Sequence, residues 1–439
     1  MGKDVLIEIG CEEIPAGFIG PALEGGQRYL EEELKKKRIS FSEVLITGSP
    51  RRLVYKIKDV GTTQQQEEDL VLGPSEKVAF DDAGNPTKAA VGFAKSLNRK
   101  VEDLKIFDTE KGRYLGFMKK EKPSPAKELL PGILAGLLPA LSFKKSMRWA
   151  DLEIRFARPV HWIISLFGKE VINFSFGPVQ SSNFTFGHRF LKPKKISIND
   201  VSEYEKKLKE AFVIVDFDAR KELIRKQLKE IEKKIGFRWV QDESLLETVT
   251  NLVEYPVTVV GKFDEEYLEL PREILITTMK EHQKYFVFED ELGNLFPGFA
   301  AVSNIITEDM DVIVRGNERV LKARLADADF YYKDDLKEPL ISKKDKLKEV
   351  IYQSDLGTYF DKVERVEKLS RKIAEWVAPT KVDMAARAAA LSKIDLTTGV
   401  VYEFPELQGI MGRYYAMKTG EEPEVAEAVF EHYLPRGAA

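Results

Sequence analysis

Arginine, lysine and aromatic residues gather in four short stretches that could contact nucleic acid. They are Arg51-Arg52, the segment from Arg148 to Arg158, His188-Arg189, and the segment from Lys192 to Lys195. Guanidinium and ammonium groups pair with phosphates, and aromatic rings stack on unpaired bases. For any one stretch, core aromatic residues flanked by surface ion pairs are the commoner explanation. The clusters alone therefore predict only a multidomain protein with several possible RNA-facing patches.

Sequence motifs that bind nucleotides are absent from the chain. No glycine-rich phosphate loop ends in Gly-Lys-Ser or Gly-Lys-Thr, and no Gly-x-Gly-x-x-Gly follows a predicted strand. The motifs His-x-Gly-His, Lys-Met-Ser-Lys-Ser and Gly-x-Gly-x-Gly-x-x-Arg are missing as well. Because these motifs bind ATP in adenylate-forming enzymes, we predict that this chain does not itself make an adenylate.

The sequence gives little support for metal-dependent or nucleophilic catalysis. HD-type phosphohydrolases hold a metal through several His and Asp ligands, including an adjacent His-Asp pair. None of the four histidines is followed by Asp, and Asp395 in the helical C-terminal part has no such companion. Cys11 precedes Glu12-Glu13, whose negative charges disfavour a reactive thiolate. We therefore predict no catalytic residue and no metal ligand on this chain.

Composition sets the broad class of the protein. A chain of 439 residues is long enough for about three domains. Its net charge of -4 is not that of a protein coating nucleic acid, so any such contact must be local. The single cysteine suits a reducing compartment, and the apolar runs are too short to span a bilayer. We expect a cytoplasmic protein with no membrane or DNA partner.

Hydrophobic spacing indicates the elements that would position these residues. Alternation predicts a strand around Val5–Ile9, then a helix opening at Pro15 and strands beginning near residues 44 and 53. An extended connection is expected over 61–86. Further helices are predicted at 87–97, 124–140 and 217–236, and strands at 112–119, 160–167, 171–176, 257–260, 285–288 and 298–302. Beyond about 336 only helical spacing remains. The predicted fold is a multidomain α+β protein with a mixed α/β N-terminal body and an all-helical end.

Many stretches, in order along the whole chain, resemble the bacterial glycyl-tRNA synthetase β subunit family. They lie at 7–15 (IEIGCEEIP), 49–53 (SPRRL), 147–149 (MRW), 156–161 (FARPVH), 187–190 (GHRF), 252–257 (LVEYPV), 279–286 (MKEHQKYF), 316–320 (GNERV), 324–330 (RLADADF), 391–396 (LSKIDL) and 403–416 (EFPELQGIMGRYYA). Each stretch is modest by itself, and together they are specific.

The resemblance implies a subunit of an α2β2 glycine–tRNA ligase. A separate α subunit would bind ATP, Mg²⁺ and glycine, while the β subunit would bind tRNA(Gly) and carry no cofactor of its own. The resemblance divides the chain into an N-terminal α+β region (1–140), a β-subunit core (141–335) and an incomplete HD-like helical domain (336–439). The family's β chains are longer, and their anticodon-binding domain would be absent here. The missing His-Asp pair suggests that the HD-like fold serves as a scaffold.

The expected role is to position tRNA beside the α subunit's glycyl-adenylate, so that proximity rather than β-subunit chemistry speeds charging. The predicted tRNA contacts are Arg51, Arg52, Arg148, Arg158 and Arg189. Joint Arg51→Ala and Arg52→Ala substitution is expected to weaken tRNA binding and flatten its salt dependence. Three alternatives stay open: an editing or hydrolytic enzyme, a scaffold that binds only the α subunit, and a different RNA-binding protein that shares these modules.

Overall fold

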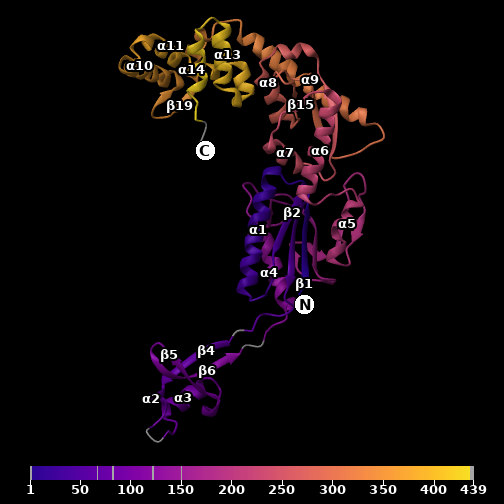
Figure 1. Cartoon of the computed structure of the whole chain (residues 1–439), viewed down its shortest axis with the longest axis vertical. Coiled ribbons are helices and arrows are strands. Elements are labelled where there is room, and N and C mark those ends of the chain that lie inside the picture. The colour runs from indigo at the N-terminus through magenta and orange to yellow at the C-terminus, as the bar shows by residue number, and fades with distance from the viewer. Residues whose placement is uncertain (1, 67, 82–83, 121–122, 150, 436–439) are drawn as a thin grey trace. The chain divides into compact units, whose positions relative to one another are not determined.

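The chain folds into two compact units, Met1–Ala211 and Phe212–Ala439, in the computed structural model shown in Figure 1. The structure describes residues 2–66, 68–81, 84–120, 123–149 and 151–435. Helices and small sheets alternate through both units, and the C-terminal part is largely helical. The predicted mixed α/β body followed by a helical region is therefore confirmed.

A mixed sheet forms the centre of the first unit. Its strands run in the spatial order β11-β12-β9-β1-β3-β2, with β10 also pairing β9. Their bounds are β1 (Lys3–Cys11), β2 (Val44–Ser49), β3 (Arg52–Val60), β9 (Val160–Phe167), β10 (Glu170–Val171), β11 (Ser175–Phe176) and β12 (Val179–Ser182). All neighbours are antiparallel except β12 and β9, which are parallel. Because β9 pairs β1, the predicted regions 1–140 and 141–335 share this sheet.

The sheet is covered on both faces, which explains why every residue of β1 from Val5 to Cys11 is buried. On one face Val5, Ile7 and Ile9 pack in a core with helices α1 (Ala16–Lys36) and α4 (Ala126–Ala140). The other face carries the alternate residues of β1. It is overlain by the segment that holds β13 (Phe184–Phe186), β14 (Lys195–Ser197) and α5 (Tyr204–Lys209). A short hairpin, β7 (Met147–Arg148) with β8 (Arg155–Phe156), precedes β9.

A three-stranded antiparallel sheet lies between β3 and α4 in the sequence. It has the order β4-β6-β5, with β4 (Glu68–Ser75), β5 (Lys105–Thr109) and β6 (Gly112–Lys120). Helices α2 (Glu76–Ala79) and α3 (Lys88–Ser96) pack against it. The extended connection expected over 61–86 is thus wrong for β4 and α2. Their apolar residues are few, and pairing with β6 supplies the partner that the local sequence does not reveal.

The second unit opens with helices and two small two-stranded sheets. The helices are α6 (Phe217–Ile235), α7 (Glu243–Thr250), α8 (Arg272–Thr277) and the long α9 (Met310–Asp335). The strands pair as β15 (Arg238–Trp239) with β17 (Phe288–Glu289), and as β16 (Val257–Lys262) with β18 (Gly298–Ser303). A π-helical turn, Thr278–His282, follows α8.

The C-terminal region carries α10 (Tyr359–Val377), α11 (Val382–Leu391), α12 (Gly399–Glu403), α13 (Ile410–Lys418) and α14 (Pro423–Glu431). Figure 1 labels α10, α11, α13 and α14 at its yellow end. One buried core joins residues 259–301 to residues 400–429 across the predicted boundary at 335. The hairpin of β19 (Ile351–Gln353) with β20 (Gly357–Thr358) corrects the expectation of an all-helical end. No helix in the described part of the chain is long and apolar enough to cross a membrane.

Candidate nucleic-acid interface

A fully buried carboxylate, Glu8, lies at the centre of the second face of the large sheet. It accepts hydrogen bonds from the indole N–H of Trp162, the hydroxyl of Tyr204 and the hydroxyl of Thr185, the last at 2.6 Å. A buried carboxylate is tolerated only when such donors replace its lost hydration. Glu8 therefore fixes the orientation of the Trp162 ring.

The Trp162 ring lies directly over Gly10. The two residues are opposite one another in the β1–β9 ladder, so both face the same side of the sheet. A Cβ atom at position 10 would come within 1.9 Å of the ring, which only glycine avoids. The guanidinium carbons of Arg51 and Arg52 lie 5.5 and 5.2 Å from the ring centroid, within cation–π range.

Arg52 is an interior residue, and its role as a tRNA contact stays a prediction. It pairs with Gly10 in the β1–β3 ladder and so faces the buried layer beside Trp162. Its side chain is fully buried, and Nη2 donates to the carbonyl oxygen of Phe186 at 2.6 Å. A phosphate cannot reach this guanidinium without opening the layer.

Arg51 and Arg189, by contrast, both line one hollow of about 380 Å³. Glu12, His161, Trp162, Phe186, Gly187 and Pro193 line the same hollow. Nε2 of His161 lies 3.1 Å from a carboxylate oxygen of Glu12. Nη1 of Arg189 lies 2.9 Å from Glu13 and 3.6 Å from Glu12. Four stretches that are far apart in the sequence therefore converge at this place.

His188 holds the backbone that carries Arg189. The imidazole is fully buried, and its Nδ1 accepts the N–H groups of Phe190 and Leu191 at 3.3 and 3.2 Å. This bonding requires an unprotonated Nδ1. His188 thus shapes the turn and is not itself exposed to a phosphate.

The remaining two predicted contacts lie outside the lining of this hollow. Arg148, on β7, is about half exposed and pairs with Glu153 at 3.1 Å. Arg158 is partly buried, and its Nη1 donates to the carbonyl of Ala157 at 3.1 Å. The structure thus brings Arg51 and Arg189 together but does not add Arg148 or Arg158 to them.

Sequence reasoning missed the residues that build the floor of this site: Glu8, Gly10, Glu12, Trp162, Thr185 and Tyr204. One signal was present, because Glu8 is the only charged residue between Val5 and Cys11 in a strand of apolar neighbours. Strict alternation places such a residue on a solvated face, whereas here that face is covered. Only the register between distant strands reveals the difference.

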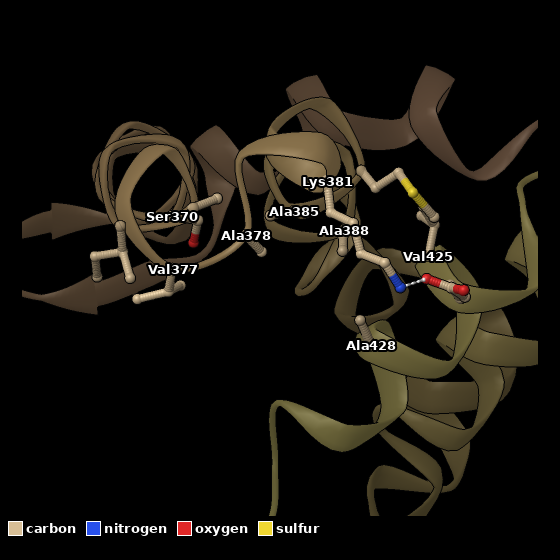
Figure 2. Close-up of a pocket in the computed structure, with 12 residues that line it drawn as sticks. Ser370, Val377, Ala378, Lys381, Ala385, Ala388, Val425 and Ala428 are labelled. Atoms are coloured by element: carbon tan, nitrogen blue, oxygen red, sulfur yellow. Dashed lines mark hydrogen bonds and ion pairs between the residues drawn. The ribbon is translucent and has the colours of Figure 1, made fainter.

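A second hollow, of about 400 Å³, lies among α10, α11 and α14 (Figure 2). Small apolar side chains such as Ala378, Ala385, Ala388 and Ala428 line it, and the Lys381–Glu424 ion pair lies at one edge. It offers van der Waals contact rather than charge. Within the described ranges, no group of three or more His, Cys, Asp or Glu residues is placed to hold a metal ion.

The hollow at Arg51 and Arg189 combines two guanidinium groups, an imidazole and a carboxylate on a fixed aromatic floor. Such a surface can bind an anionic group that also offers hydrogen-bond donors.

Comparison with known proteins gives the family. A family model described as glycyl-tRNA synthetase beta subunit matches residues 5–439. The chain is 48% identical over 438 residues to the glycine–tRNA ligase beta subunit of Trichlorobacter lovleyi. It is 47% identical to that of Geobacter sp. strain M21 and 45% identical to that of Geobacter sulfurreducens. Each match covers all of this chain but only 64% of the relative's length. The chain belongs to the glycyl-tRNA synthetase beta subunit family.

Proposed function

We propose that this chain is the tRNA-binding partner of a separate α subunit in a glycine–tRNA ligase of the cytoplasm. Family membership supports this proposal, and so does the lack of the known ATP-binding motifs in the sequence. The single observation that carries it is the convergence of Arg51, Arg189 and His161 around one hollow. ATP, Mg²⁺ and glycine would bind the α subunit, and no residue of this chain would touch the reacting atoms.

The proposed mechanism is positional. Phosphate groups of tRNA(Gly) pair with the guanidinium groups of Arg51 and Arg189, which are directed by Trp162 and by Glu13 respectively. These contacts carry no sequence information, but they fix the register and orientation of the RNA. Holding the acceptor end near the glycyl-adenylate converts a bimolecular encounter into an oriented reaction within one complex. The helical C-terminal region, as an HD-like scaffold, would add support without chemistry.

Assembly with the α subunit is the first test. Light scattering on a sizing column, with this chain and the α subunit of its own species mixed, is expected to give one peak containing both chains in equal number. Separate elution of the two chains, repeated with a full-length β subunit that also fails to bind, contradicts the proposed partnership.

RNA binding is the second test, and the buried position of Arg52 decides which variant to use. Arg51→Ala alone is expected to weaken tRNA(Gly) binding about fivefold to tenfold. It should also reduce the slope of log affinity against log salt by about 0.7–0.9, the contribution of one lost phosphate contact. Arg238→Ala is a matched control, because Arg238 is exposed in the other unit and its guanidinium forms an ion pair with the exposed Glu291. Equal slopes for wild type and Arg51→Ala would remove this hollow from the interface.

A further inference from the structure

Phe190 stands out beside the hollow because 67% of its surface is exposed. An isolated exposed phenylalanine carries little information. Here, however, it is the only large apolar side chain that is exposed between residues 151 and 211, all of which the structure describes. Its neighbours in the sequence include the cationic Arg189, Lys194 and Lys195 as well as the apolar Leu191 and Pro193.

The turn that carries Phe190 is held in one conformation from several sides. The N–H of Phe190 bonds the buried His188 ring, and the N–H of Lys192 bonds the carbonyl of His188 at 3.0 Å. His188 in turn donates its own N–H to Ala211 at 3.0 Å. Gly187 has no room for a Cβ, which would come within 2.3 Å of the Lys192 carbonyl oxygen. Because the turn is already ordered, a ligand does not bear the entropy of fixing it.

Phe190 is joined to the cationic hollow through Arg189. The guanidinium carbon of Arg189 lies 5.2 Å from the Phe190 ring centroid, and the same residue lines the hollow with Arg51. An aromatic face therefore adjoins a hollow that two arginines line. That combination matches one nucleotide, whose base stacks and whose phosphate pairs with the arginines.

We propose that Phe190 is a stacking platform for one unpaired base of the bound RNA, with the phosphate of that nucleotide held by Arg189 and Arg51. This inference rests on the proposed function, because it requires that the chain bind RNA. It goes further by naming the ligand feature, an unpaired nucleotide rather than a double helix. A base inside a duplex has both faces covered by its neighbours and cannot occupy such a platform.

The test compares variants of the whole chain for binding to labelled tRNA(Gly), followed by fluorescence anisotropy. Phe190→Leu removes the aromatic face and is expected to weaken binding about tenfold, within the range for loss of one base stack. Phe190→Tyr and Phe190→Trp keep the face and should bind like wild type. The salt slope should stay unchanged in all three, because no charge is altered. Phe330→Leu is the matched control, since Phe330 is 63% exposed in the other unit.

A short single-stranded RNA and a blunt RNA duplex of the same length identify the feature that is bound. The Phe190→Leu effect should appear with the single strand and vanish with the duplex. In the Phe190→Trp variant, the single strand should quench the added tryptophan fluorescence.

Three results would overturn the inference while leaving the proposed function intact. These are tRNA binding unchanged by Phe190→Leu, an equal loss with duplex RNA, and a loss that affects only assembly with the α subunit. Failure of the wild-type chain, alone and with the α subunit, to bind tRNA at all would instead overturn the proposed function, and the inference with it.

Discussion

Asp395 provides a prediction about stability whose sign and size follow from its surroundings. It lies in a short 3₁₀ helix (Ile394–Thr397) and is fully buried. One carboxylate oxygen accepts the N–H groups of Gly409 and Gly412 at 2.5 and 3.2 Å. Burial nevertheless dominates over these bonds and raises the pKa of the carboxyl from its ordinary 3.8 to about 6.

The raised pKa makes the folded state less stable as the pH rises. Below about pH 4 the carboxyl is protonated in both the folded and the unfolded chain. Between about pH 4 and pH 6 the unfolded chain releases this proton while the folded chain keeps it, so unfolding becomes more favourable. Above about pH 6 the carboxyl is ionised in both states, and the accumulated loss of folding stability is constant. A difference of about two pKa units corresponds to about 3 kcal/mol.

Asp395→Asn removes this dependence. The amide oxygen can still accept the N–H groups of Gly409 and Gly412, and the side chain does not ionise. The free energy of unfolding of the variant, relative to wild type, is therefore expected to rise by about 3 kcal/mol between pH 4 and pH 7. Denaturant unfolding followed by circular dichroism at several pH values measures this difference.

Neighbouring groups titrate too, but they are the same in both proteins. Burial lowers the pKa of His432 to about 4, so this residue reduces stability as the pH falls from about 6.5 to about 4, the opposite direction. Burial lowers the pKa of Lys393 to about 8, outside the window. The difference in unfolding free energy between variant and wild type therefore isolates the contribution of Asp395. Asp383→Asn, at a highly exposed position, is the control. A constant difference across pH 4–7 would refute the reasoning.

Two further predictions concern the floor of the candidate interface. Glu8→Ala leaves three buried donors without their acceptor, at about 1–3 kcal/mol each, so it should destabilise the first unit by at least about 3 kcal/mol. Glu8→Gln keeps an acceptor and should cost less. Hydrogen exchange of the β1 and β9 amides measures both effects, and equal protection in the two variants would contradict this prediction. Gly10→Ala should displace Trp162, lower the free energy of unfolding by about 1–3 kcal/mol or more, and weaken tRNA binding. In the control Gly20→Ala, the added Cβ meets nothing within 4 Å, so this variant should be neutral or slightly more stable. Unfolding and anisotropy measurements that fail to separate the two variants would count against the packing argument.

Local patterns predicted the elements whose signals lie within one short segment. Helix α6 is an example, because Ile224, Leu228 and Ile231 repeat at helical spacing and are buried. Its ends are also marked in the sequence, by Asp216, which caps the Ala219 N–H, and by Gly236 in the left-handed region at φ 75°. No distant residue is needed to recognise such a helix.

Elements with a weak local pattern, or with a fold that depends on distant partners, were the ones missed or misjudged. The strand expected over 171–176 is two short strands, β10 and β11, because each pairs a different neighbour. Helix α9 was not predicted despite its 26 residues, since its buried positions Leu321, Leu325 and Ala328 are surrounded by charged residues that weaken the apolar pattern. Strand β4 likewise depends on β6, about forty-five residues further along the chain.

The candidate site shows the same division between local and distant information. The sequence identified Arg51 and Arg189 by type, and the structure places them at one hollow. It could not separate Arg51 from its neighbour Arg52, because Arg51 lies in the turn before β3 while Arg52 is the first residue of that strand, and only the pairing with β1 places Arg52 in the covered layer. Whether these arginines contact RNA stays a prediction.

The charge arrangement around Trp162 explains how a chain of net charge -4 could still bind RNA. Trp162 donates its indole N–H to Glu8 on one side and presents its ring to Arg52 on the other, so the buried anion and the buried cation share one covered layer. That layer adds little to the surface field, and Glu12 and Glu13 offset part of the charge of Arg189. Affinity at this site would therefore come from a few oriented contacts rather than from a broad positive potential. A shallow salt dependence, corresponding to only a few phosphate contacts, is the expected consequence.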